Sequence, residues 1–181
     1  MRIIAGSAKG ARLTKVPPGT RPLSDRAREG LFSSLGSEIE GAVCLDLYAG
    51  TGAVGIEALS RGADSCLFVD SSPAAMRAIQ ENLQRVHLAD RGRITRARVT
   101  EALAREAGPF DLVFLDPPYA IEDAEIEEVL ALVADRLDRN GSFVLTRPKQ
   151  KDSTDVIPLE FRPARLLSYG DARILVVRRE P

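Results

Sequence analysis

The feature that most constrains the fold of this chain is a regular alternation of short apolar runs with amphipathic helical patterns. The runs at 43–47, 65–70, 93–97, 111–115 and 141–146 have the length and composition of buried strands. Helical patterns occupy the segments between them, at 53–61, 73–86, 100–107 and 124–137. Because strand–helix–strand units build a parallel sheet with right-handed crossovers, this alternation predicts a doubly wound α/β fold.

Different patterns flank this series at both ends. Two further β-type runs, 161–168 and 173–178, are joined by only four residues and predict an antiparallel hairpin that closes the sheet. At the amino end, 2–5 and 11–14 surround a turn with two glycines and predict a small β-hairpin. The segment 24–35 then has the capping residue and the apolar face of a helix.

Length and composition favour one folded unit. The 181 residues, 44% of them hydrophobic, are enough for one domain with a full core. We predict a Rossmann-like α/β domain over 1–181 with a seven-stranded, mostly parallel sheet, in which 1–36 form a basic hairpin and helix extension and 37–181 form the core. Cys44 and Cys66 lie in apolar runs and are expected to be buried thiols, and no Cys and His cluster suggests zinc. With no membrane-length apolar stretch and no signal-peptide pattern, we expect a soluble, cytoplasmic monomer.

Charge is distributed unevenly along the chain. Residues 1–28 contain seven Lys and Arg and one Asp, whereas 99–140 contain eleven Asp and Glu and three Arg. A basic arm beside an acidic flank predicts a face that binds a polyanion, although a merely solvated surface explains the same pattern. The predicted nucleic-acid-binding cations are Lys9, Arg12, Lys15 and Arg28.

A glycine-rich loop follows the first strand of the series. Gly50, Gly52 and Gly55 match G-x-G-x-x-G, in which absent side chains let the backbone approach a nucleotide-containing cofactor. The pattern alone suits a nicotinamide cofactor and S-adenosylmethionine equally, and the glycines could serve only a tight turn. Asp46 lies on the strand side of the loop, where an anion attracts a sulfonium or an ammonium and repels a pyrophosphate. The sequence therefore favours S-adenosylmethionine.

Three other positions complete the predicted cofactor site. Asp70 ends the second strand and can accept hydrogen bonds from ribose hydroxyls or, alternatively, cap the helix that follows. Arg26, at the start of the first helix, is a candidate to close over the cofactor. Around Val99 we expect backbone groups to read the adenine. The predicted cofactor-binding residues are Asp46, Tyr48, Ala49, Gly50, Thr51, Gly52, Asp70, Ser71, Val99 and Arg26.

The motif Asp116-Pro117-Pro118-Tyr119 directly follows the apolar strand at 111–115. The Asp116 carboxylate and a backbone carbonyl can accept the two hydrogens of an exocyclic amine, and the Tyr119 ring can stack on the base that carries it. The prolines hold both groups in place because each fixes φ at about −65°. Asp116, Pro117, Pro118 and Tyr119 are therefore the predicted catalytic residues, for a flat substrate that bears an amine.

Three segments carry a resemblance to a known family. The first is Arg2-Ile3-Ile4-Ala5-Gly6 with the nearby Lys9-Gly10, and the second is 21–32, which is close to Arg-Pro-Thr-x-Asp-Arg-x-Arg-Glu-x-Leu-Phe but has Leu23 where Thr is common. The third is 45–62, joined by the Asp-Pro-Pro-Tyr motif. Together they resemble the bacterial 16S ribosomal RNA guanine-N2 methyltransferases, the RsmD family, over nearly the whole chain.

The resemblance implies a class I S-adenosylmethionine-dependent methyltransferase, whose sheet closes with a C-terminal hairpin. It implies transfer of a methyl group to the exocyclic N2 of a specific guanine in 16S ribosomal RNA, without a metal. The target guanine is expected to leave its stack and pack on Tyr119. The expected partner is 16S rRNA within a small-subunit assembly particle.

Three alternatives stay open. An adenine-N6 or other nucleic-acid amino-methyltransferase shares the Asp-Pro-Pro-Tyr motif, but such enzymes usually carry a large target-recognition region for which this chain has no room. Protein glutamine methyltransferases prefer Asn as the first residue of the motif and carry a helical N-terminal domain. A non-catalytic RNA-binding or ribosome-assembly module would keep the fold without turnover.

Overall fold

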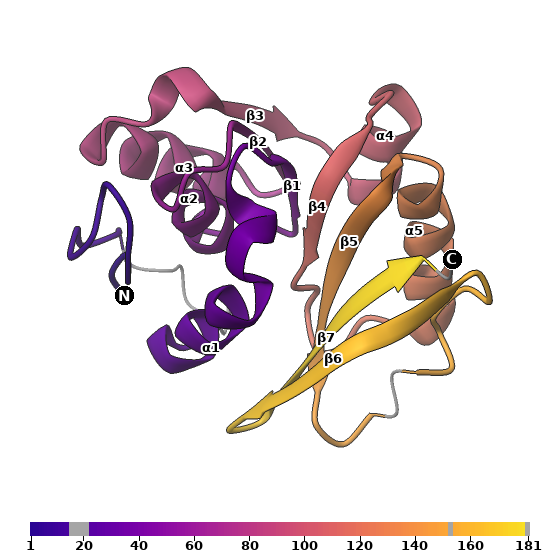
Figure 1. Cartoon of the computed structure of the whole chain (residues 1–181). Coiled ribbons are helices and arrows are strands. Elements are labelled where there is room, and N and C mark those ends of the chain that lie inside the picture. The colour runs from indigo at the N-terminus through magenta and orange to yellow at the C-terminus, as the bar shows by residue number, and fades with distance from the viewer. Residues whose placement is uncertain (15–21, 152–153, 180–181) are drawn as a thin grey trace.

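The computed structural model describes residues 1–14, 22–151 and 154–179 and has a seven-stranded sheet with helices on both faces (Figure 1). The strands are β1 Val43–Leu47, β2 Ser65–Asp70, β3 Gly92–Arg96, β4 Phe110–Leu115, β5 Leu137–Pro148, β6 Phe161–Tyr169 and β7 Ala172–Arg179. The helices are α1 Asp25–Leu35, α2 Ala53–Ser60, α3 Pro73–Arg85, α4 Val99–Arg105 and α5 Asp123–Ala134, with short 3-10 turns η1 Gly36–Ile39 and η2 Ala89–Arg91.

The strand order of the sheet is β3-β2-β1-β4-β5-β7-β6. Strands β1 to β5 pair in parallel, whereas β7 is antiparallel to both β5 and β6. The predicted doubly wound sheet with a closing hairpin is confirmed. The order reverses between β1 and β4, and sheets of this kind bind ligands at the carboxyl ends of the strands beside such a reversal.

An apolar layer covers each face of the sheet, so the strands are buried on both faces. Helices α1, α2 and α3 pack on one face, and α4 and α5 pack on the other (Figure 1). Helix α1 shows how the sequence selects this arrangement. The Ser24 side chain caps it by accepting a hydrogen bond from the Ala27 backbone N–H, and Ala27, Leu31 and Leu35 bury one side of the helix against the core.

The N-terminal segment is a shorter hairpin than the one predicted. A single antiparallel bridge joins Arg2 and Arg12. The turn between them lies against α2, and at Gly6 φ is 82°. A Cβ at Gly6 would come within 1.8 Å of the Ser60 carbonyl oxygen, so a side chain at this position would push the segment off the helix.

A buried carboxylate in α2 anchors this segment to the core. Glu57 accepts hydrogen bonds from the backbone N–H groups of Ile4 (2.8 Å) and Ala5 (3.1 Å). The same carboxylate pairs with Arg61 at 2.7 Å and with Arg28 at 3.5 Å. Both Glu57 and Arg28 are fully buried, so this network joins the hairpin, α1 and α2 through interactions that exclude water.

Element boundaries differ most from prediction at the start of β5. The helix expected to reach residue 137 ends at Ala134, and β5 begins at Leu137 instead of residue 141. Leu137 pairs with Phe110, and a register shift then separates this pair from the rest of the β4–β5 ladder. Pairing across the sheet therefore overrides the local helical periodicity. The prolines of the segment 16–22 predict a stiff, extended linker, and this segment lies, except for Pro22, outside the described residues.

Candidate active site

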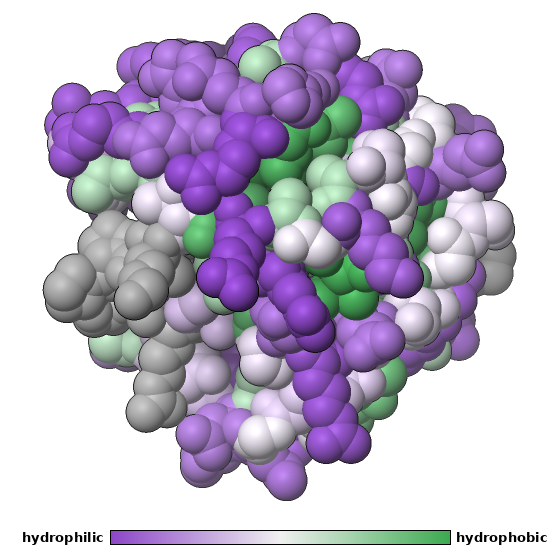
Figure 2. Space-filling model, turned by 90° about the vertical axis from the view of Figure 1, so that its left-hand side faces the viewer, coloured by the Kyte–Doolittle hydropathy of each residue, from purple (hydrophilic) through white to green (hydrophobic). Residues whose placement is uncertain are grey.

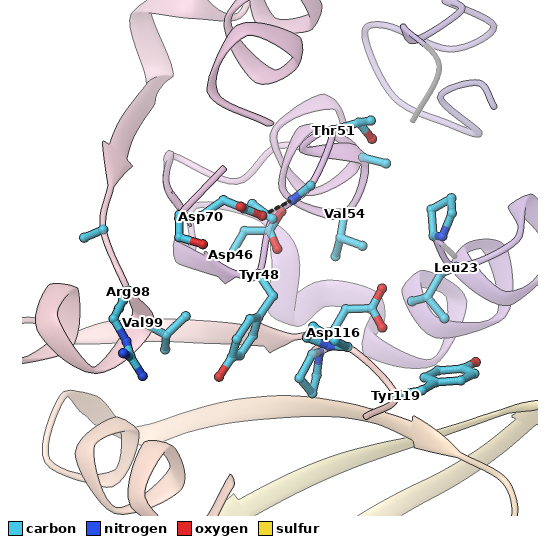
Figure 3. Close-up of a pocket in the computed structure, with 18 of the residues that line it drawn as sticks. Leu23, Asp46, Tyr48, Thr51, Val54, Asp70, Arg98, Val99, Asp116 and Tyr119 are labelled. Atoms are coloured by element: carbon cyan, nitrogen blue, oxygen red, sulfur yellow. Dashed lines mark hydrogen bonds between the residues drawn. The ribbon is translucent and has the colours of Figure 1, made fainter. Parts of the chain in front are cut away.

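A cavity of about 820 Å³ lies at the carboxyl ends of β1, β2 and β4, beside the start of α1 (Figure 3). Its walls come from the loop after β1, the ends of β2 and β3, and the motif after β4. The predicted site residues that line it are Arg28, Asp46, Tyr48, Ala49, Gly50, Thr51, Asp70, Ser71, Val99, Asp116, Pro117, Pro118 and Tyr119. The fold thus brings the predicted cofactor loop and the predicted catalytic motif to one cavity.

The loop after β1 turns sharply into α2. Tyr48 has φ 58°, in the left-handed region that non-glycine residues seldom adopt, and Gly50 and Gly52 follow with φ 55° and 76°. The third glycine serves packing, because a Cβ on Gly55 would lie 2.4 Å from the Phe68 ring in β2. The loop therefore needs its glycines both for the turn and for the close approach of α2 to the sheet.

Two carboxylates hold this loop in place. The Asp46 Oδ2 accepts a hydrogen bond from the Gly55 backbone N–H at 3.0 Å, and the Asp70 Oδ2 accepts one from the Gly50 N–H at 2.9 Å. The Asp70 Oδ1 also accepts from the Ser72 N–H at 2.9 Å. It is the Ser72 hydroxyl that caps α3, so Asp70 links the ends of two loops while lining the cavity.

Asp116 stands at the end of β4 with its side chain on the cavity wall. Figure 3 shows Asp116, Tyr119 and Leu23 on one side of the cavity and Val99 on the opposite side. Protein surrounds the Asp116 carboxylate except toward the cavity, and this burial raises its pKa to about 7, although a hydrogen bond with the Thr146 side chain acts to lower the pKa. The Asp116 carboxyl group is therefore expected to lose its proton near neutral pH.

The cavity is rich in carboxyl groups. Carboxylates of Asp46, Asp70, Asp116 and Glu125 all line it. Burial raises the pKa of Asp46 well above its usual value; a hydrogen bond from Gly55 lowers it, and the charges of Asp116 and Asp70 raise it further. A cationic group in the cavity would favour the ionised carboxylates, whereas a pyrophosphate would be repelled. These carboxyl groups therefore suit a ligand that carries a sulfonium and an ammonium.

A smaller hollow of about 330 Å³ shares Pro22, Leu23, Asp116 and Tyr119 with the main cavity. Its other lining residues are Ser24 and Ala27 of α1, Thr146 of β5, and Tyr169, Gly170, Asp171 and Ala172 around the β6–β7 turn. Asp116 and Tyr119 therefore border two spaces. The larger space adjoins the glycine loop, and the smaller one lies between α1 and the C-terminal hairpin.

The structure corrects the assignment of Arg28 as a phosphate-binding residue. Its side chain is fully buried, pairs with Asp25 at 2.6 Å and Glu57 at 3.5 Å, and donates to the Arg2 carbonyl oxygen at 2.7 Å. Arg28 therefore contributes to the inner wall of the main cavity, and its guanidinium is not exposed on the outer surface as a phosphate-binding residue of the basic arm would be. Arg26, predicted to close over the cofactor, is exposed and does not appear among the lining residues of either space.

The predicted basic arm is only partly described. Lys9 and Arg12 are exposed on the N-terminal hairpin, and Lys15 lies outside the described residues. Figure 2 shows the face that is on the left of Figure 1, with hydrophilic side chains covering most of it and apolar ones visible in the hollows near its centre.

Two absences hold for the part of the chain that the structure describes. No helix there is long and apolar enough to cross a membrane. No group of three or more His, Cys, Asp and Glu residues is placed there to hold a metal ion. Cys44 and Cys66 are buried free thiols, and burial raises the pKa of both.

Several cavity residues were missed from the sequence. Thr146 reaches Asp116 from β5, and Arg98 and Glu125 line the cavity from the starts of α4 and α5. Leu23 also lines the cavity, and its position inside the basic motif at 21–32 was the one sequence signal that could have identified it as a site residue. The others lie within ordinary helix and strand patterns, and only the packing brings them to the cavity.

The parallel sheet closed by an antiparallel hairpin, with its cavity at the strand-order reversal, defines the fold of a class I methyltransferase. The family model described as "Conserved hypothetical protein 95" matches residues 1–178, and the chain belongs to this family. The resemblance recognised in the sequence is confirmed.

Named relatives agree with this membership. The chain is 34% identical over 185 residues to "Putative rRNA methyltransferase YlbH" of Bacillus subtilis, covering 99% of both chains. It is 38% identical over 137 residues to "Ribosomal RNA small subunit methyltransferase D" of Escherichia coli, covering 75% of this chain and 67% of that protein. The solved structure of "Putative methyltransferase yhhF" from Escherichia coli superposes with a TM-score of 0.85 at 31% identity, covering 99% of this chain and 98% of the other.

Proposed function

We propose that this protein transfers a methyl group from S-adenosylmethionine to the exocyclic N2 of a guanine in 16S ribosomal RNA of the small subunit. The names of its relatives support rRNA of the small subunit as the substrate. The observation that carries the proposal is the position of Asp116 and Tyr119 between two spaces, of which one fits a cationic cofactor and the other adjoins it.

The main cavity supports S-adenosylmethionine as the donor. When bound, this cofactor supplies a methyl group already activated by a sulfonium. Asp70 would accept hydrogen bonds from the ribose hydroxyls, and Asp46 would face the positive charges of the ligand. The first turn of α2 lines the cavity through Ala53 and Val54, and backbone N–H groups at such a position suit the ligand's carboxylate.

The catalytic motif would prepare the amine for attack. An exocyclic guanine amine is a poor nucleophile because its lone pair is delocalised into the ring. Asp116 and the Pro117 carbonyl would accept its two hydrogens, so that the lone pair points at the methyl group and the positive charge that develops on nitrogen is stabilised. Tyr119 would stack on the extruded base and offset part of the unstacking cost of a few kcal/mol. Holding donor and acceptor in line supplies much of the remaining acceleration.

The test is an Asp116→Ala variant assayed on small-subunit particles and on naked 16S rRNA from cells that lack this protein. We expect the methylation rate to fall by about 10²–10³-fold, with S-adenosylmethionine affinity by calorimetry nearly unchanged. Asp64→Ala, which changes an exposed carboxylate at the start of β2, is the matched control.

Nucleoside analysis of the product RNA by mass spectrometry identifies the methylated atom. N2-methylguanosine is the expected product, and faster methylation of the particle than of naked RNA would support an assembly intermediate as the substrate. N6-methyladenosine would identify the enzyme as an adenine methyltransferase. A wild-type protein that binds S-adenosylmethionine but methylates no RNA would refute the proposal.

A further inference from the structure

The segment that carries the catalytic motif runs beside the end of β5. The parallel β4–β5 ladder has Leu115 opposite Leu145, so the residues that follow the two strands start side by side. After the motif, the Ile121 N–H donates to the Pro118 carbonyl oxygen at 3.0 Å and closes a turn around Tyr119. The position of the Tyr119 ring therefore depends on what holds this turn.

The backbone of the motif itself offers few restraints. Pro117 and Pro118 have no N–H to donate. The Asp116 N–H reaches the Leu47 carbonyl oxygen only at 3.5 Å, which is long for a backbone hydrogen bond. Contacts from neighbouring elements must therefore contribute to fixing the motif.

Two cations from the end of β5 converge on the far side of the turn. The Arg147 Nη2 donates to the Asp123 Oδ1 at the start of α5. The Lys151 Nζ lies 3.6 Å from the same oxygen and donates to the Ile121 carbonyl oxygen at 3.2 Å. Together these contacts clamp the residues that follow Tyr119 against β5.

The burial of Arg147 in this clamp is costly for stability. Its side chain is 1% exposed, and within the described residues neither its Nε nor its Nη1 has a hydrogen-bond partner. Its register partner on β7 is Arg173, which places two positive charges opposite each other on neighbouring strands. The Asp123 side chain is 52% exposed and only partly offsets this cost. An apolar side chain at position 147 would be at least as stable.

We propose that Arg147, together with Lys151, is a positioning residue that holds the turn so that Asp116 and Tyr119 face the methyl donor. This inference rests on the proposed function. A displacement of about 1 Å at the reacting groups can lower a rate by about 10²-fold. A clamp that stabilises the geometry of the motif can therefore serve the reaction even where it lowers the stability of the fold.

The experiment compares wild type with Arg147→Met in three measurements. The Tm should stay unchanged or rise, because an apolar side chain replaces a guanidinium with unpaired donors. The Ile121 amide should exchange at least about tenfold faster with solvent, the value of one hydrogen bond between charged groups. On small-subunit particles that lack the modification, kcat should fall by about 10- to 100-fold. Rates are expressed per S-adenosylmethionine-binding site, counted by calorimetry, so a loss of folded protein cancels.

Two further variants and a control separate positioning from stability. Arg147→Lys keeps a cation for the single contact with Asp123 and should retain most of kcat, although a buried lysine lowers the Tm. Lys151→Met changes a partly exposed side chain and should speed exchange of the same amide and lower kcat. The control is Arg165→Met, which removes an ion pair of 3.1 Å with Glu38 at the opposite end of the sheet and should change neither measurement.

The outcomes also distinguish this inference from the proposed function. If Arg147→Met unfolds, or if Tm and kcat fall together in Arg147→Met and Arg147→Lys alike, Arg147 serves the fold and the inference is wrong. If Arg147→Met and Lys151→Met leave either the Ile121 exchange or kcat at the wild-type value, the clamp does not position the motif. If the wild type itself methylates no RNA, the proposed function fails and the catalytic role of the clamp falls with it.

Discussion

Replacing Glu57 with Gln tests whether the buried network anchors the N-terminal segment. The substitution keeps the shape of the side chain but removes the charge from a carboxylate with four partners: two backbone N–H groups, Arg61 and Arg28. Removing one partner of a buried ion pair costs about 3–5 kcal/mol. Arg28 keeps its contact with Asp25, so we expect the lower value, about 3 kcal/mol.

For a chain of this length, about 3 kcal/mol corresponds to a fall in Tm of roughly 6–12 °C. The measurement is thermal and urea unfolding followed by circular dichroism, with hydrogen exchange at the amides of Ile4 and Ala5, which should lose protection first. Glu29→Gln, an exposed change on α1, is the control and should stay within about 0.5 kcal/mol of wild type. A loss of less than about 1 kcal/mol for Glu57→Gln, with both amides still protected, would show that packing alone holds the segment.

Four further predictions concern the site and its surroundings. Because burial raises the pKa of Asp116 to about 7 and the ionised form accepts the amine hydrogens, kcat/KM should fall about tenfold per pH unit below 7, and Asp116→Asn should abolish this dependence. The same raised pKa means that ionisation opposes folding, so Asp116→Asn should gain stability over wild type as pH rises from about 4 to 7 in urea titrations. Replacing Lys9, Arg12 and Lys15 together should weaken RNA binding and flatten its salt dependence, and an unchanged slope would exclude the arm from the interface. Gly55→Ala should cost about 1–3 kcal/mol by overpacking against β2 and weaken S-adenosylmethionine binding by calorimetry; full stability would contradict the tight packing.

Local patterns in the sequence were sufficient for most of the fold. Strand and helix periodicities differ, so the alternation of elements could be read directly, and the closing hairpin followed from two β-type runs without a helix between them. The glycine loop and the Asp-Pro-Pro-Tyr motif each directly follow a strand. Because parallel strands place their carboxyl ends at one edge, residues as far apart as Asp46 and Tyr119 could be assigned to one site before any tertiary contact was known.

Only the tertiary structure decided which charged side chains are buried. The sequence placed Arg28 among the cations of an RNA-binding surface, because residues 1–28 are rich in Lys and Arg. Its partner Glu57 lies 29 residues away in α2, and no local pattern reveals such a pairing. The smaller hollow likewise joins α1 to the β6–β7 turn, which carries Asp171. Motifs within a few residues of one another are encoded locally, whereas a buried ion pair or a hollow between distant elements exists only once the chain has packed.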